Sequence, residues 1–170
     1  MVTKKVEKAL NDQIMKEEHS SRLYLSMASW CERNGFQGAA TWLYAQAEEE
    51  RMHMLKLVHY LNDRGGSAVY SAMEPIDQTY KTLLDAFQKV LKHEEFISQS
   101  INELYAVCNA SKDYTTAQYL QWYINEQIEE ESTARAILDK IRLAGTHEGG
   151  LFMIDKELAG MAAAKVAAAT

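Results

Sequence analysis

Apolar residues recur at alternating steps of four and three along most of the chain, and this spacing predicts four long amphipathic helices. Residues three or four positions apart lie on one face of a helix, so each pattern describes a seam that faces a core. The predicted helices cover about residues 4–33, 39–64, 83–109 and 113–143. Asn34-Gly35 and Gly65-Gly66 follow the first two as helix-ending signals. The pattern therefore predicts an all-α fold in a single domain, residues 1–170.

The connection between the second and third predicted helices has a different character. Residues 67–79 show no helical period and contain Pro75, the one proline of the chain. Such a segment extends to about 40 Å, and a helix of about 27 residues has a similar length. The segment can therefore run along the bundle as a long crossover. A short fifth helix is predicted at about residues 151–160, and we expect no fixed structure for the alanine-rich tail 161–170.

Each seam carries polar residues near the middle of its helix, where apolar residues are expected. These residues are Glu17, Glu50, His53, Glu94, Gln127 and Glu130. Burying a carboxylate without a partner is costly, so a positive group is expected to meet these acids inside the bundle. If the seams are instead shifted by one residue, the acids are simply solvated. Four acids in phase and near the helix centres favour the buried arrangement.

An internal repeat relates the two halves of the chain. Glu17 precedes Glu50 by 33 residues, and Glu94 precedes Gln127 by the same number. The second pair follows the first at an offset of 77 residues. The chain is therefore predicted to be two related helix pairs about an approximate two-fold axis, with Glu17 opposite Glu94.

Composition and charge narrow the possible partners. The 170-residue chain is 47% hydrophobic and 25% charged, which is typical of a globular domain rather than a disordered one. A net charge of -6 argues against nucleic acid as the main partner and leaves cations as plausible ones. No stretch approaches the ~20 apolar residues that a membrane span needs, and the N-terminus has no signal-peptide pattern. We therefore expect no membrane partner and a cytoplasmic location.

The inward acids suggest a metal site. Four carboxylates in one layer would raise one another's pKa, and divalent cations would neutralise them. Oxygen ligands with a single imidazole and no thiolate suit iron or manganese better than structural zinc, although zinc could still bind. The spacing suggests His53 on one metal, Glu130 on another and Glu50 between the two. Gln127 is a neutral amide at an acid's position and would weaken the hold on the second metal.

These motifs, on four helices with a long crossover, resemble the non-haem ferritins of bacteria and archaea, and ferritin-like di-iron proteins are a general example of this bundle arrangement. The resemblance covers about residues 5–160 and includes Leu120-Gln-Trp-Tyr123 and Gly150-Leu-Phe-Met-Ile-Asp-Lys-Glu157. It implies a ferritin-like four-helix bundle with a short fifth helix and an iron-storage function. It also implies a ferroxidase, which oxidises Fe²⁺ with dioxygen or peroxide, in a homo-oligomeric cage of twenty-four subunits.

The resemblance further implies roles for the seam residues. The first of two iron ions per chain would be held by Glu17, Glu50 and His53. The second would be held by Glu50, Glu94 and Glu130. Each Fe²⁺ would give one electron to the oxidant between them, since carboxylates favour Fe³⁺.

Other residues also match the family by position. Gln127 would lie beside the dioxygen pocket, and Tyr24 matches a tyrosine near the centre, although it could simply be a buried aromatic residue. Glu49, Glu126 and Glu129 match a possible third iron site on the side that faces the shell interior. The alternative is that these three are ordinary exposed acids.

Three alternatives stay open at this point. Bacterioferritins carry a second Glu-x-x-His where this chain has Gln127-x-x-Glu130, and a haem-binding methionine where it has Arg51, so no haem is expected. Rubrerythrin-like peroxidases usually carry a C-x-x-C module, which this sequence does not contain. A carrier cage with a weak or degenerate redox site is the third alternative. The intact ligand set argues against it, and iron-dependent oxygen consumption would distinguish the two.

Overall fold

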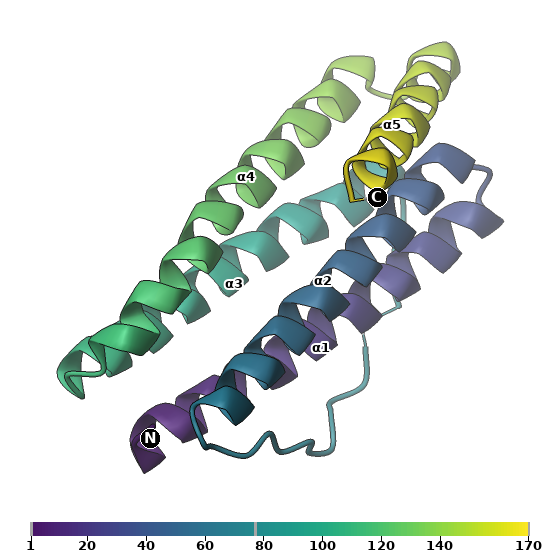
Figure 1. The fold of residues 1–170 in the computed structure, drawn as a ribbon. Coiled ribbons are helices and arrows are strands. Elements are labelled where there is room, and N and C mark those ends of the chain that lie inside the picture. The colour runs from purple at the N-terminus through teal and green to yellow at the C-terminus, as the bar shows by residue number, and fades with distance from the viewer. Residues whose placement is uncertain (1, 77, 170) are drawn as a thin grey trace.

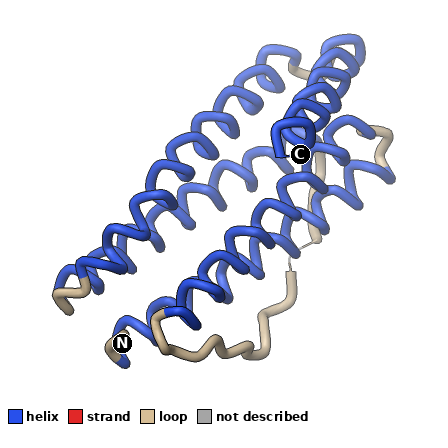
Figure 2. The backbone as a smooth tube through the Cα atoms, viewed as in Figure 1, coloured by secondary structure: helices blue, strands red, loops and turns tan. Residues whose placement is uncertain are grey.

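The computed structural model describes residues 2–76 and 78–169, which form five helices and no strand (Figures 1 and 2). The helices are α1 (Lys4–Arg33), α2 (Gln37–Asp63), α3 (Leu83–Ala110), α4 (Tyr114–Ala144) and α5 (Glu148–Ala169). The predicted all-α fold is confirmed, and the ends of the four long helices agree with the seam pattern to within about two residues. In the described part of the chain, no helix has the length and apolar composition needed to cross a bilayer.

Local sequence signals set the ends of these helices. Three of them begin after a residue whose side chain accepts a hydrogen bond from a backbone N–H of the first turn: Thr3, Thr82 and Asp113. Gly35 follows the end of α1 with a φ of 85°, and Gly145 follows the end of α4 with a φ of 58°. Left-handed backbone of this kind favours glycine, so both residues stop their helices.

The connection from α2 to α3 runs along the outside of the bundle, as Figure 1 shows. Near its start, the Val69 N–H donates to Asn11 Oδ1 of α1 at 2.7 Å. Near its end, the Tyr80 ring lies 6.0 Å from the Trp30 ring, toward the opposite end of α1. The connection therefore carries the chain along the bundle, from the N-terminal end of α1 to its C-terminal end, and the predicted crossover is found. The helix pairs α1–α2 and α3–α4 are each antiparallel and closely packed.

The C-terminal segment differs from the prediction. The fifth helix begins at Glu148 and continues to Ala169, so most of the tail expected to lack fixed structure is helical. Alanine has the highest intrinsic helix propensity, and α5 packs against α2 and α4 with Leu158 and Ala162 buried. The alanine-rich composition therefore continues this helix. Thr170 lies outside the described residues.

A residue of α5 caps the N-terminus of α2. The N-cap residue of α2, Phe36, makes no side-chain capping hydrogen bond. Instead, the Asp155 carboxylate accepts hydrogen bonds from the Gly38 N–H at 3.0 Å and the Ala39 N–H at 2.8 Å. A Cβ on Gly38 would lie 1.7 Å from the Asp155 carbonyl oxygen, so this close approach requires glycine. The contact fixes α5 onto α2 and positions the residues that follow Asp155.

We expect the Asp155→Ala variant to be less stable than the wild type by about 1–2 kcal/mol, because two N–H groups lose a charged acceptor at a helix N-terminus. The melting temperature of the metal-free protein should fall by about 2–8 °C, measured by circular dichroism. Asp139→Ala is the matched control, because Asp139 is exposed on α4 and forms only a surface ion pair with Arg142. An equal loss in both variants would contradict the capping role.

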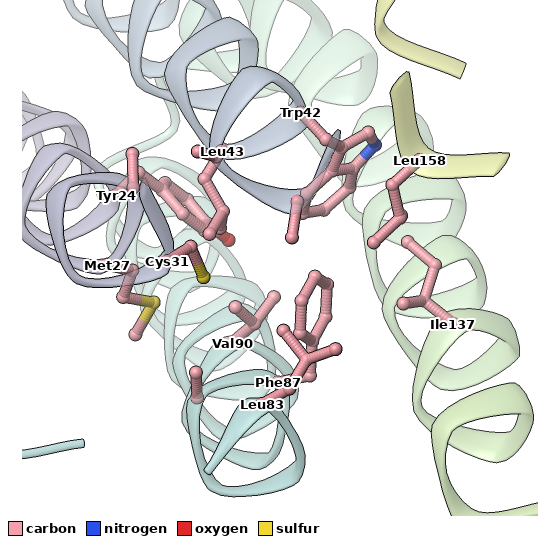
Figure 3. Close-up of a cluster of buried hydrophobic side chains, with 14 of the residues drawn as sticks. Tyr24, Met27, Cys31, Trp42, Leu43, Leu83, Phe87, Val90, Ile137 and Leu158 are labelled. Carbon is pink, nitrogen blue, oxygen red and sulfur yellow. The ribbon is translucent and has the colours of Figure 1, made fainter. Parts of the chain in front are cut away.

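Two clusters of buried hydrophobic side chains fill the bundle and leave a polar layer between them. Figure 3 shows the cluster that lies toward α5, where Leu43, Phe87 and Ile137 come from three different helices. The second cluster lies toward the N-terminal end of α1 and extends to Tyr123 of α4. The burial of apolar side chains on both sides supplies the favourable free energy that holds the polar layer in the interior.

Candidate metal centre

Six polar side chains from the four long helices form the layer between the two hydrophobic clusters. They are Glu17 of α1, Glu50 and His53 of α2, Glu94 of α3, and Gln127 and Glu130 of α4. Each is at most 5% exposed. The structure therefore buries the residues that the seam spacing placed inside, and the solvated alternative does not apply to them.

Glu17, Glu50 and His53 form a compact cluster. One potential ligand atom from each lies within 4.8 Å of the others, and His53 Nδ1 lies 3.7 Å from Glu50 Oε2. The Gln13 amide donates to Glu17 Oε1 at 2.8 Å. The other oxygen, Glu17 Oε2, is buried and has no hydrogen-bond partner among the described residues. A buried acceptor left unpaired is unfavourable, and a cation between these side chains would satisfy it.

Glu94 is held by two neutral donors on the other side of the layer. The Tyr24 hydroxyl donates to Glu94 Oε1, and the Gln127 amide donates to Glu94 Oε2 at 3.1 Å. Tyr24 is fully buried, so its hydroxyl has little access to solvent. The structure therefore places both Tyr24 and Gln127 directly on this carboxylate.

Glu130 has a charged neighbour that the sequence patterns did not suggest. The Gln46 amide donates to Glu130 Oε2 at 2.9 Å. The Lys165 ammonium of α5 lies 3.6 Å from Glu130 Oε1, donates to Gln46 Oε1 at 2.6 Å and forms an ion pair with Glu49. The acids of the layer are thus linked to the end of the C-terminal helix.

A second cluster borders the layer, formed by Glu49, His53 and Glu126 with ligand atoms within 4.8 Å of one another. The family resemblance grouped Glu49 and Glu126 with Glu129, but the Glu129 side chain is exposed and lies outside this cluster. Glu129 is one helical turn beyond Glu126, and its side chain points to solvent. The structure therefore brings together two of the three expected acids, with His53 completing the cluster.

Burial dominates the electrostatics of the layer. It raises the pKa of Glu17 and of Glu50 well above the usual range, and the neighbouring charges of Glu50 on Glu17 and of Glu94 on Glu50 add to this. Burial also raises the pKa of Glu94, and it raises the pKa of Glu130 to about 8 despite the opposing charge of Lys165. Without a metal, the layer therefore retains protons at neutral pH. Cations that bind there must displace them.

Three neighbours of the site were not found from the sequence: Gln13, Gln46 and Lys165. Gln13 and Gln46 each precede a seam acid by four residues, so a search for polar residues one helical turn before each acid would have found them. Lys165 lies in a tail for which no structure was expected. The available signal was that it is the one charged residue among residues 161–170.

A pocket of about 830 Å³ opens onto this region between α2 and α4. The Trp122 ring lies 5.3 Å from the His53 ring in a perpendicular arrangement, and the Tyr123 hydroxyl donates to the His53 carbonyl oxygen at 2.8 Å. These contacts fix α4 against α2 beside the site. The pocket lining includes Glu49, His53, Trp122, Glu126 and Lys165. Solvent ions can therefore reach the second cluster from this side.

Comparisons with known proteins agree with this geometry. The family described as Ferritin-like domain matches residues 7–144. The bacterial non-heme ferritin of Campylobacter jejuni is 44% identical over 95% of this chain and 97% of its own length, and that of Escherichia coli O6:H1 is 44% identical over 88% and 90%. An open-pore ferritin of Archaeoglobus fulgidus superposes with a TM-score of 0.92 at 38% identity, covering 94% of this chain and 98% of its own. The chain therefore belongs to the ferritin family.

Proposed function

We propose that this ferritin oxidises Fe²⁺ to Fe³⁺ at a site for two iron ions within each chain and stores the ferric product inside a homo-oligomeric shell of twenty-four subunits. The observation that carries the proposal is the buried cluster of Glu17, Glu50 and His53, with a Glu17 oxygen that has no partner among the described residues. Family membership and relatives named non-heme ferritins support iron as the metal.

We assign each iron a position from the donor set. Glu17, Glu50 and His53 would hold the first Fe²⁺, and Glu50, Glu94 and Glu130 the second. Glu50 suits the shared position, because its carboxylate lies 3.7 Å from His53 Nδ1 and the charge of Glu94 raises its pKa. Carboxylates with one imidazole stabilise Fe³⁺ relative to Fe²⁺ and so favour loss of an electron.

Protons and electrons balance in this scheme. Each Fe²⁺ loses one electron, and the pair reduces dioxygen with two protons to hydrogen peroxide, or hydrogen peroxide with two protons to water. The raised pKa values of Glu50 and Glu130 indicate that iron binding releases protons inside the site, close to where the oxidant needs them. The Tyr24 and Gln127 donors hold the Glu94 carboxylate in one orientation during this step.

The product must leave the site, and two features favour this. Gln127 supplies a neutral amide instead of a fourth acid near Glu94, so the second iron is held less strongly. Glu49 and Glu126 stand at the adjoining pocket with His53, and we assign them to a third iron position on the way out. Glu129 would join them only after its exposed side chain turns inward.

The direct test is oxygen uptake after Fe²⁺ is added to the metal-free protein. We expect fast uptake that saturates at about two irons per chain, as a di-iron site requires. The Glu94→Gln variant should be slower by at least about tenfold, because the second iron loses a charged ligand. Glu95→Gln is the matched control, since Glu95 is the next residue of α3 and is exposed. Slow uptake that is equal in all three proteins would contradict the proposal and favour a carrier cage.

A further inference from the structure

The last turns of α5 deliver one positive charge to the candidate metal centre. Lys165 is the one charged residue among residues 161–170, and its ammonium is directed at the acids on the α2–α4 side of the layer. It pairs with Glu49 and lies 3.6 Å from Glu130 Oε1. Figure 1 shows the C-terminal end of α5 beside α2, the helix that carries Glu49. A tethered cation thus occupies positions that a metal ion would need.

The hydrogen-bond network shows that Lys165 is built into this side of the layer. Gln46 accepts a hydrogen bond from the Lys165 ammonium at 2.6 Å and donates one to Glu130 Oε2 at 2.9 Å. Gln46 itself is 1% exposed. Glu130 is buried and Lys165 is partly exposed at the pocket, so the ammonium neutralises the acids from the solvent-facing edge of the layer.

The attachment of α5 to the bundle is uneven along its length. The first part is fixed by the Asp155 cap on α2 and by the buried side chains of Leu158 and Ala162. Beyond Ala162, the alanines at positions 163, 164 and 167 are exposed. The charged contact of this last part with the bundle is made by Lys165. Lys165 therefore supplies the charged part of the attachment near the end of α5, while Asp155, Leu158 and Ala162 anchor the part before it.

We propose that Lys165 is an internal counter-ion that occupies the Glu49 and Glu130 side of the centre in the metal-free protein and is displaced by incoming Fe²⁺, so that the end of α5 leaves the bundle as the centre fills. This inference rests on the proposed function, because the displacing ion is the iron at that centre. A divalent cation carries twice the charge of the ammonium and binds carboxylate oxygens at shorter distance. The two cations also repel each other across a shared acid.

This arrangement links the second iron to the third position. Glu130 belongs to the proposed second iron site and Glu49 to the third, and Lys165 contacts both. An iron that binds at one of these two acids weakens the ion pairs of Lys165 with both. The other acid then becomes available to a second iron. When the iron has left, the ammonium returns and neutralises the acids again, which disfavours return of the product.

Equilibrium binding of Co²⁺ without oxygen tests the competition with a metal that undergoes no oxidation here. Of the Co²⁺ ions that bind at the centre, we expect the one with the lower affinity to bind about tenfold more tightly to Lys165→Gln than to the wild type. In the variant no ammonium has to be displaced. Lys165→Arg should keep the wild-type affinity. Lys156→Gln is the matched control, since Lys156 lies on the same helix and is exposed.

Equal affinity of Lys165→Gln and the wild type would overturn the counter-ion role and leave the proposed function intact. If the wild-type protein bound no Co²⁺ at the buried acids, the proposed function would fail and this inference with it.

Hydrogen exchange measured by mass spectrometry tests the movement of α5. In the wild type, Co²⁺ should speed exchange in residues 163–169 several-fold, while residues 148–160 remain unchanged because Asp155 still anchors them. In Lys165→Gln, residues 163–169 should already exchange fast, with no further effect of Co²⁺. Unchanged or slower exchange of this segment in the metal-bound wild type would overturn the displacement.

Discussion

Replacement of Glu50 by alanine should slow iron-dependent oxygen uptake by about a hundredfold, the largest effect expected of any single substitution in this chain. Glu50 lies at the centre of the layer. Its carboxylate is within 4.8 Å of ligand atoms of Glu17 and His53, and the charge of Glu94 contributes to its raised pKa. Because both proposed iron positions use this carboxylate, its loss should weaken both at once, whereas Glu94 serves one.

The variant must be shown to fold before its loss of activity is interpreted. Alanine removes a buried carboxyl group and leaves a small cavity, so Glu50→Gln is the companion that keeps the shape and removes only the ability to ionise and bind metal as a carboxylate. Both variants should melt at or near the wild-type temperature in metal-free form, since the wild-type acid is buried close to other acids. Glu95→Ala, on the exposed side of α3, should oxidise iron like the wild type. Fast uptake by a folded Glu50→Ala protein would exclude the proposed centre.

The four long helices could be predicted from the sequence because each satisfies several local requirements together. The seam spacing, the caps such as Asp113 and the stop at Gly35 all specify the same boundaries. The C-terminal helix was predicted at about residues 151–160, but its extension through the alanine-rich tail could not be predicted in this way. Its alanines give no amphipathic pattern, and its length depends on packing against α2, which is a tertiary contact that no local pattern encodes.

The same distinction between local patterns and tertiary contacts applies to the candidate site. Residues such as Glu17 and Glu94 stood out because an acid in an apolar seam conflicts with the local pattern, and such conflicts are expected at functional sites. Lys165 and Gln46 gave no such signal, because one is a lysine in a low-complexity tail and the other a glutamine beside the seam. Glu129 was grouped by resemblance with acids that the structure holds elsewhere. The direction of a side chain at a helix surface is decided by its neighbours in space.

The same buried acids should make the stability of the metal-free protein fall as the pH rises. The pKa of Glu130 is about 8 in the folded protein, against 4.5 as its ordinary value, so the folded state binds an extra proton between these limits. Stability therefore decreases with pH throughout this window. Buried His93 acts in the opposite sense at lower pH, because burial and the charge of His19 lower its pKa to about 4 from 6.5. Above pH ~6.5, His93 no longer contributes to the pH dependence of stability, so the acids can be measured separately.

Between pH ~6.5 and ~8, titration of Glu130 alone should lower the free energy of unfolding by about 2 kcal/mol, or the melting temperature by about 4–8 °C. Glu17 and Glu50, with pKa values raised in the same direction, add to this slope. In Glu130→Gln the slope should be smaller but present, since Glu17, Glu50 and Glu94 remain. Co²⁺ should stabilise the protein more at the upper pH, because fewer protons must be displaced. A melting temperature that rises with pH in this range would mean that the acids are already ionised and compensated without metal.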